Sequence, residues 1–202
     1  LAATWTPNVV YQVGAAGGKE VKENNIAAWL TPALNIHRSP LCGRNFEYYS
    51  EDPLLAGVLA GAMVKGIQSQ GVAATVKHFA LNNKETDRKH SDSRVSERAA
   101  REIYLKAFEY VIKGAKPWAV MSSYNIINGC YASENKELLE DILRDEWGFD
   151  GMVTTDWWTL GEHYKEVKAG NDMKMACGDP KRLKEAMDQG LLTRQDLEHC
   201  AE

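Results

Sequence analysis

The chain has 202 residues, of which 44% are hydrophobic and 26% are charged, and its formal net charge is -4 at pH 7. This balance is typical of a globular protein and excludes the disordered and fibrous classes. No run approaches the roughly 20 apolar residues of a membrane span, so we expect no membrane segment. Lys and Arg are dispersed among Asp and Glu, without the basic stripe of a nucleic-acid partner.

The four cysteines lie far apart in the sequence, at Cys42, Cys130, Cys177 and Cys200. No C-x-x-C pair is present, which argues against a zinc ribbon and against a thioredoxin-type site. A chain of this length can build a core without disulfides, so we expect reduced, structural cysteines and a cytoplasmic location. The chain begins at Leu1 without Met, and we expect a preceding piece.

Short apolar runs alternate with longer amphipathic segments along the chain. Both faces of these runs are apolar, which is typical of buried parallel strands. The predicted strands are 26–30, 72–76, 118–121, 151–155 and, more weakly, 172–175.

Five helices are predicted by apolar residues at helical spacing between N-cap and glycine signals. They begin at Asp52-Pro53, Ser93, Ser133, Asp179-Pro180 and Thr193, and the first four end at Gly71, Gly114, Gly148 and Gly190. Thr193 and Asp196 have the spacing of a capping box.

This strand–helix repetition predicts an α/β fold with a parallel sheet, either doubly wound or closed into a barrel. No nucleotide-binding glycine motif follows a strand and no metal-ligand spacing occurs, so we expect no cofactor and no metal. We predict one domain over 1–202, a (β/α) TIM-type barrel. Such a barrel has eight strands, whereas periodicity yields about five, so the barrel is expected to be incomplete in this chain.

Reactive residues of such barrels lie at the C-terminal ends of the strands. Polar and aromatic residues gather at these places: Arg44, Glu47, Lys77, His78, Arg88, Tyr124, Asp156, Trp157 and Trp158. Aromatic planes beside a carboxylate suit a sugar, which presents apolar C–H faces and many hydroxyls.

Structural roles compete with this interpretation. His37 and His163 fit satisfied structural histidines, Arg44 and Glu47 fit a simple ion pair, and Lys77 fits a cap on the sheet edge. Asp156 also fits a helix N-cap. The residues alone therefore do not name a reaction.

Several ordered motifs nevertheless resemble glycoside hydrolase family 3, the β-glucosidase family. They are LTPALNIHRSP at 30–40, GRNFE at 43–47, SEDP at 50–53, KHF at 77–79, MSSYN at 121–125, GFDG at 148–151 and TDW at 155–157. The resemblance covers nearly the whole chain. It implies a barrel domain of a retaining glycosidase that acts on a β-linked oligosaccharide or on an aryl or alkyl glycoside.

The resemblance also implies roles for individual residues. Asp156 occupies the place of the nucleophile in the family's S-D-W motif, which reads T-D-W here. The residues expected to contact the terminal sugar are Arg44, Lys77, His78, Arg88, Met121, Tyr124 and Trp157. Glu47 is expected to orient Arg44 rather than to touch the substrate.

The acid partner of Asp156 is not identified in the sequence. In most of the family it comes from a second, α/β sandwich domain, which would follow Glu202, and the family's first barrel strand would precede Leu1. In the N-acetylglucosaminidase subgroup the acid is a His in a loop, and His90-Ser91-Asp92 matches that loop only in reverse. We therefore expect a fragment, completed by the missing remainder or by another chain.

Two alternatives stay open at this point. The fragment can be an inactive sugar-binding module, or Lys77 can form a Schiff base as in barrel lyases. A metal hydrolase built from His37, His78 and Asp156 is disfavoured, because the spacing of metal-binding motifs is missing.

Overall fold

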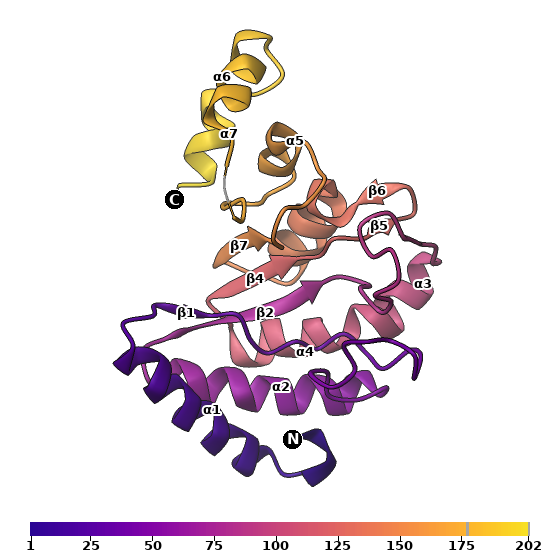
Figure 1. The fold of residues 1–202 in the computed structure, drawn as a ribbon, viewed down its shortest axis with the longest axis vertical. Coiled ribbons are helices and arrows are strands. Elements are labelled where there is room, and N and C mark those ends of the chain that lie inside the picture. Colours follow the sequence, from indigo (N-terminus) through magenta and orange to yellow (C-terminus); the bar gives the residue numbers. More distant parts are fainter. Residues whose placement is uncertain (177, 202) are drawn as a thin grey trace.

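A computed structural model describes residues 1–176 and 178–201. The fold is α/β, with a four-stranded parallel sheet in the order β1 (Ala28–Trp29), β2 (Ala73–Phe79), β4 (Ala119–Ser122) and β7 (Met152–Thr155) (Figure 1). This sheet is part of a TIM-type barrel, so the predicted fold class is confirmed.

Three helices pack on one side of the sheet: α1 (Pro7–Glu23), α2 (Pro53–Gln68) and α4 (Lys106–Ala115) (Figure 1). Val76, Val120 and Val153, one from each of the three longer strands, are fully buried in the main hydrophobic core. Phe79 and Phe108 meet in the same core with ring centroids 5.1 Å apart. Burial of this apolar surface is the main stabilising contribution.

The remaining elements are shorter. A second sheet joins β3 (Asp92–Ser93), β5 (Ile126–Ile127) and β6 (Cys130–Tyr131). The other helical segments are η1 (Ala2–Thr4), α3 (Glu97–Ala99), η2 (Ala100–Tyr104), η3 (Ala132–Glu134), η4 (Glu137–Glu146), α5 (His163–Lys168), α6 (Pro180–Asp188) and α7 (Arg194–His199). Helices α6 and α7 extend beyond the β7 side of the sheet (Figure 1).

The two outer strands leave the barrel open. Among the described residues β1 pairs with β2 alone, and the outer edge of β7 carries a single bridge between Thr154 and Met173. No helix of the described residues is both long enough and apolar enough to cross a membrane.

Four predicted strands and most of the predicted caps are confirmed. The Asp52 carboxylate accepts hydrogen bonds from the Leu54 and Leu55 amides, and Asp179 accepts from Arg182. Thr193 and Asp196 form the predicted capping box. The predicted strand at 172–175 is reduced to the bridge at Met173.

Two of the predicted helix starts are wrong. Ser93 lies in β3, where its hydroxyl donates to Leu81 O, and the helix starts after Ser96, whose hydroxyl caps the Ala99 amide. That helix also runs past Gly114, as far as Ala115.

Ser133 does not cap η4, because its hydroxyl donates to a buried carboxylate. Asn135 accepts from the Leu138 amide in its place. In both cases a tertiary contact takes up the hydroxyl that the sequence pattern had assigned to a cap.

Cys42, Cys130 and Cys200 carry free thiols, as expected. Cys177 lies outside the described residues.

Helix α1 was not predicted, because Gly14, Gly17 and Gly18 interrupt its pattern and glycine is a weak helix former. The structure explains these glycines by close packing between helices. A Cβ built on Gly14 would come within 2.6 Å of the Met63 carbonyl oxygen of α2 and 3.3 Å of the Gly66 Cα.

We predict that Gly14→Ala destabilises the fold by about 1–3 kcal/mol, because the added methyl group forces α1 away from α2. Gly114→Ala is the matched control, since a Cβ there meets nothing within 4 Å. It should stabilise α4 by up to about 1 kcal/mol. Thermal denaturation of both variants would measure the difference. Equal melting temperatures would contradict the packing argument.

Candidate active site

The candidate residues come from the C-terminal ends of the parallel strands and from the loops that follow them. Lys77 and His78 lie within β2, because this strand continues three residues beyond the predicted end at Val76. The loop before it is paired there, since Leu34 N donates to Lys77 O at 2.8 Å and Lys77 N donates to Pro32 O at 3.0 Å. The polar residues Lys77 and His78 therefore belong to the strand, although the apolar pattern that predicts it ends at Val76.

Asp156 directly follows β7, and its side chain is buried. Its amide donates to Ser122 O at 3.0 Å, which fixes its backbone to the end of β4. Oδ1 accepts from the Trp157 amide at 2.7 Å, whereas the buried Oδ2 has no hydrogen-bond partner among the described residues. An unpaired buried oxygen is costly, so this atom is a candidate for a contact with a bound molecule.

Burial raises the pKa of Asp156 above its usual value, because desolvation disfavours the charged form. The Trp157 amide, the Tyr124 side chain, Arg44 and Arg88 act in the opposite direction and lower this pKa. The carboxylate therefore lies in a field of donors and cations that partly offsets the cost of its burial.

Glu47 pairs with two cations of the site, Arg44 and Lys77. Its Oε1 accepts from Arg44 Nε, and its Oε2 lies 3.6 Å from Lys77 Nζ. Burial lowers the pKa of Lys77, while the charge of Glu47 raises it. The expectation that Glu47 orients Arg44 agrees with this contact.

His78 is 1% exposed, and its peptide groups are fixed by Asn35. His78 N donates to Asn35 Oδ1 at 2.8 Å, and Asn35 Nδ2 donates to His78 O at 2.9 Å. Its Nε2 lies 3.8 Å from Asp156 Oδ2, too far for a direct hydrogen bond. Burial is the main cause that holds the pKa of His78 well below its usual value, and the positive charges of Arg44 and Lys77 lower it further. The imidazole is therefore neutral at pH 7.

Arg88 packs on the face of Tyr124, with its Cζ 4.5 Å from the ring centroid, and donates to Glu85 at 2.9 Å. Lys89 Nζ lies 5.0 Å from the same centroid and donates to Trp158 O at 2.9 Å. The pKa of Tyr124 is raised to about 12, mainly by burial and secondly by the negative charge of Asp156. The loop after β2 is thus joined to the loop after β7.

Met121 and Trp157 complete the candidate set. Met121 is buried on β4, opposite Thr154 of β7. The Trp157 side chain remains 39% exposed, and its ring lies 5.6 Å from that of Trp158. An exposed aromatic pair beside a buried carboxylate has the form expected of a sugar site.

Of the structural roles that compete for single residues, one is wrong and two are supported. The N-cap role of Asp156 is wrong, since α5 begins only at His163. The structural role of His37 is supported by its contact with Asn45 O at 3.1 Å, and that of His163 by the Asp179 amide, which donates to its Nδ1. No group of three or more potential ligands among the described residues is placed to hold a metal ion.

Two further residues support the site, Asn35 and Lys89, and the sequence patterns assign no role to either of them. Asn35 stands in a polar stretch before the predicted second strand, and its role depends on a partner 43 residues away. Lys89 resembles any solvated lysine of a polar loop. No local signal distinguishes either residue.

A family model described as "Glycosyl hydrolase family 3 N terminal domain" matches residues 1–202. The chain is 65% identical over 198 residues to beta-glucosidase A of Butyrivibrio fibrisolvens, covering 98% of this chain and 24% of that protein. It is 45% identical to an exo-alpha-(1->6)-L-arabinopyranosidase of Bifidobacterium longum, covering 100% and 27%. The chain thus spans about a quarter of the length of these relatives.

Among solved structures, beta-glucosidase 3B of Thermotoga neapolitana in complex with glucose matches with a TM-score of 0.96 and 49% identity. The match covers 98% of this chain and 29% of that one.

We predict that Glu47→Gln lowers the pKa of Lys77 further, because the negative charge that favours its protonated form is lost. The pKa would be followed by NMR titration of the reductively methylated lysine. Glu51→Gln, on an exposed residue of the same loop, is the control and should leave the titration of Lys77 unchanged. A Lys77 pKa that rises in Glu47→Gln would show that the ion pair is not formed.

Proposed function

Because the chain belongs to glycosyl hydrolase family 3, through the N-terminal domain of that family, we propose that the complete protein is a retaining β-glucosidase with Asp156 as its nucleophile. The proposal rests on the conjunction of family membership and a buried carboxylate at the end of a barrel strand.

The single structural observation that carries the proposal is the buried Asp156 carboxylate at the end of β7, whose Oδ2 has no hydrogen-bond partner among the described residues. A retaining glycosidase needs an ionised carboxylate that attacks the anomeric carbon and forms a covalent glycosyl ester. An oxygen already bound by a hydrogen bond would be a weaker nucleophile. Oδ1, held by the Trp157 amide, orients the carboxylate, and Oδ2 is left for the attack.

The surrounding cations fit the binding of a terminal sugar. In the proposal Arg44, Lys77 and Arg88 donate to hydroxyls, and these hydrogen bonds strengthen as the ring distorts toward the oxocarbenium-like transition state. The neutral imidazole of His78 can donate without adding charge beside the nucleophile. Met121, Tyr124 and Trp157 form the walls of the subsite.

We assign the general acid to a carboxyl group outside residues 1–202. A retaining enzyme places it about 5–5.5 Å from the nucleophile, where it protonates the departing oxygen. The short span of this chain relative to its relatives supports this assignment. In the same way we propose that the remainder of the protein, or a partner chain, covers the open edges of the sheet.

A Schiff-base reaction at Lys77 is the second candidate, because burial lowers the pKa of this amine. Its ion pair with Glu47 argues for a hydroxyl donor instead. The preferred sugar is left open between glucose and a related pyranose, since one relative carries an arabinopyranosidase name. The cytoplasmic location stays a prediction.

We expect the complete protein to form a covalent ester on Asp156 when it is given a 2-deoxy-2-fluoro β-glucoside with a good leaving group. Mass-spectrometric peptide mapping would place the label on the segment 151–157. Asp156→Ala should fold and remain unlabelled. Label on Glu85, Asp87 or Asp92 would identify a different nucleophile, and trapping of Lys77 by borohydride with a carbonyl substrate would favour the lyase.

We further expect Tyr124→Phe to move the acid limb of kcat/KM to higher pH. Tyr124 lowers the pKa of Asp156, so its loss raises that pKa, and a higher pH is then needed to ionise the nucleophile. The pH profile of the complete enzyme would measure this shift. Tyr131→Phe, on β6, should leave the limb in place. A shift to lower pH would contradict the electrostatic role of Tyr124.

A further inference from the structure

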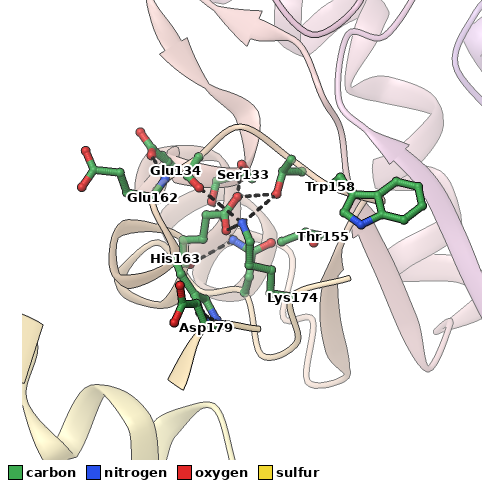
Figure 2. A network of polar contacts seen from close by, with 12 residues as sticks. Ser133, Glu134, Thr155, Trp158, Glu162, His163, Lys174 and Asp179 are labelled. Carbon is green, nitrogen blue, oxygen red and sulfur yellow. Dashed lines mark hydrogen bonds and ion pairs between the residues drawn. The ribbon is translucent and has the colours of Figure 1, made fainter. Parts of the chain in front are cut away.

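A buried polar network lies beside the loop that carries Trp158 (Figure 2). We call it the Glu166 network, and its members are Ser133, Thr159, Glu166, Asn171 and Lys174. Glu166 is fully buried, and its Oε1 accepts from the hydroxyls of Ser133 at 2.9 Å and Thr159 at 2.6 Å. Its Oε2 accepts from Lys174 Nζ.

The charges of this network are completely satisfied. An ammonium group has three donors, and Lys174 Nζ uses them on Glu166, on Thr159 Oγ1 at 3.1 Å and on Gly161 O at 3.3 Å. Gly161 fits closely, because a Cβ at this position would come within 2.6 Å of Glu166 Oε1. A satisfied buried network of this kind favours one conformation over its alternatives.

The segment held in this way is the irregular loop that carries the tryptophan pair. Trp158 has φ of 52°, in the left-handed region that bulky residues avoid. Its N–H donates to Met175 O at 3.0 Å, and its C=O accepts from Lys89. Thr159 is the next residue, so the network acts directly beside this strained position. Figure 2 shows the indole of Trp158 pointing away from the network.

The network also reaches the end of β4, to which the Asp156 amide is hydrogen-bonded. Asn171 Nδ2 donates to Glu166 O at 2.9 Å and to Ser133 O at 2.6 Å, while its Oδ1 accepts from Ser122 Oγ at 2.7 Å. Ser122 O in turn accepts from the Asp156 amide. Asp156, before the tryptophan pair, is therefore bonded to β4, and Thr159, after the pair, is bonded to Lys174.

We propose that Glu166 and Lys174 are positioning residues, which act through Thr159 to hold Trp157 and Trp158 at the mouth of the sugar site. This inference rests on the proposed function for its kinetic consequence. A buried ion pair is weak evidence for stability, since apolar residues of similar volume often serve as well or better. Its placement at a strained aromatic loop, between the nucleophile and α5, points to conformational control.

The test uses the complete protein and three substitutions. Thr159→Val keeps the shape and removes the hydroxyl, Thr159→Ser keeps the hydroxyl, and Lys174→Met removes the charge. Arg101→Met is the control, because Arg101 forms an ion pair with Glu146 at 2.7 Å between the helical segments η2 and η4, outside the segment 157–175. All variants are measured well below their melting temperatures.

We expect Thr159→Val and Lys174→Met to raise KM for an aryl β-glucoside about 10-fold, because a displaced tryptophan pair loses sugar contacts that are made in the ground state and the transition state alike. The fall in kcat should be smaller, because the loop binds sugar throughout the reaction. Thr159→Ser should restore KM to near the unsubstituted value. Arg101→Met should leave KM unchanged.

A second readout does not depend on activity. In protein labelled with 5-fluorotryptophan, the ¹⁹F resonances of Trp157 and Trp158, assigned with single Trp→Phe variants, should shift or broaden in Thr159→Val and Lys174→Met. They should stay in place in Arg101→Met.

Unchanged resonances and unchanged KM in both network variants would overturn the inference, as would a rise in KM of equal size in Arg101→Met. Shifted resonances in a protein that hydrolyses no β-glycoside and takes no label on Asp156 would support the positioning role and refute the proposed function.

Discussion

The parallel register of β2, β4 and β7 is the constraint on which the site depends. Ser123 N donates to Phe79 O at 2.8 Å, and Asp156 N donates to Ser122 O at 3.0 Å, so the pairing continues past the ends of the strands. Because parallel strands end at the same edge, these bonds bring side chains from distant parts of the sequence to one place. A shift of one residue would turn Asp156 toward the opposite face of the sheet and remove it from the cations.

Electrostatics then decides how these side chains can act. Burial alone would favour the neutral form of Asp156, and an isolated buried carboxylate would be protonated rather than nucleophilic. The cations oppose this, but a group of cations without counterions would itself be costly. Glu47, paired with Arg44 and Lys77, and Glu85, paired with Arg88, balance them. The site thus combines carboxylates that hold cations with one carboxylate whose Oδ2 has no partner among the described residues.

Periodicity and caps predicted the strands at 72–76, 118–121 and 151–155 and the helices that begin at Asp52 and Asp179, because these depend on local sequence. They failed where a tertiary contact used the same group, as at Ser93 and Ser133. Helix α1 is not predicted because glycine is a weak helix former, and its glycines serve close contact with α2 instead. For the site, motifs indicated which residues gather, whereas the partners of Asn35 and Lys89 lie 43 and 69 residues along the chain, too far to be inferred.

In a helix or a strand the regular backbone fixes the direction of each side chain. The loop between β7 and α5 has no such regular structure. Asp156 is held by backbone pairing to β4, whereas Trp158 adopts a left-handed conformation that local preference disfavours. Such a conformation persists only where its surroundings determine it, and here these are Met175, Lys89 and the Glu166 network. Met175 and Lys174 belong to the segment that lies along the outer edge of β7, since Met175 N donates to Thr155 Oγ1 at 2.9 Å. The segment that pairs with the outermost strand is therefore also the one that shapes the aromatic loop, so the geometry of the tryptophans follows from the same sheet that positions the nucleophile.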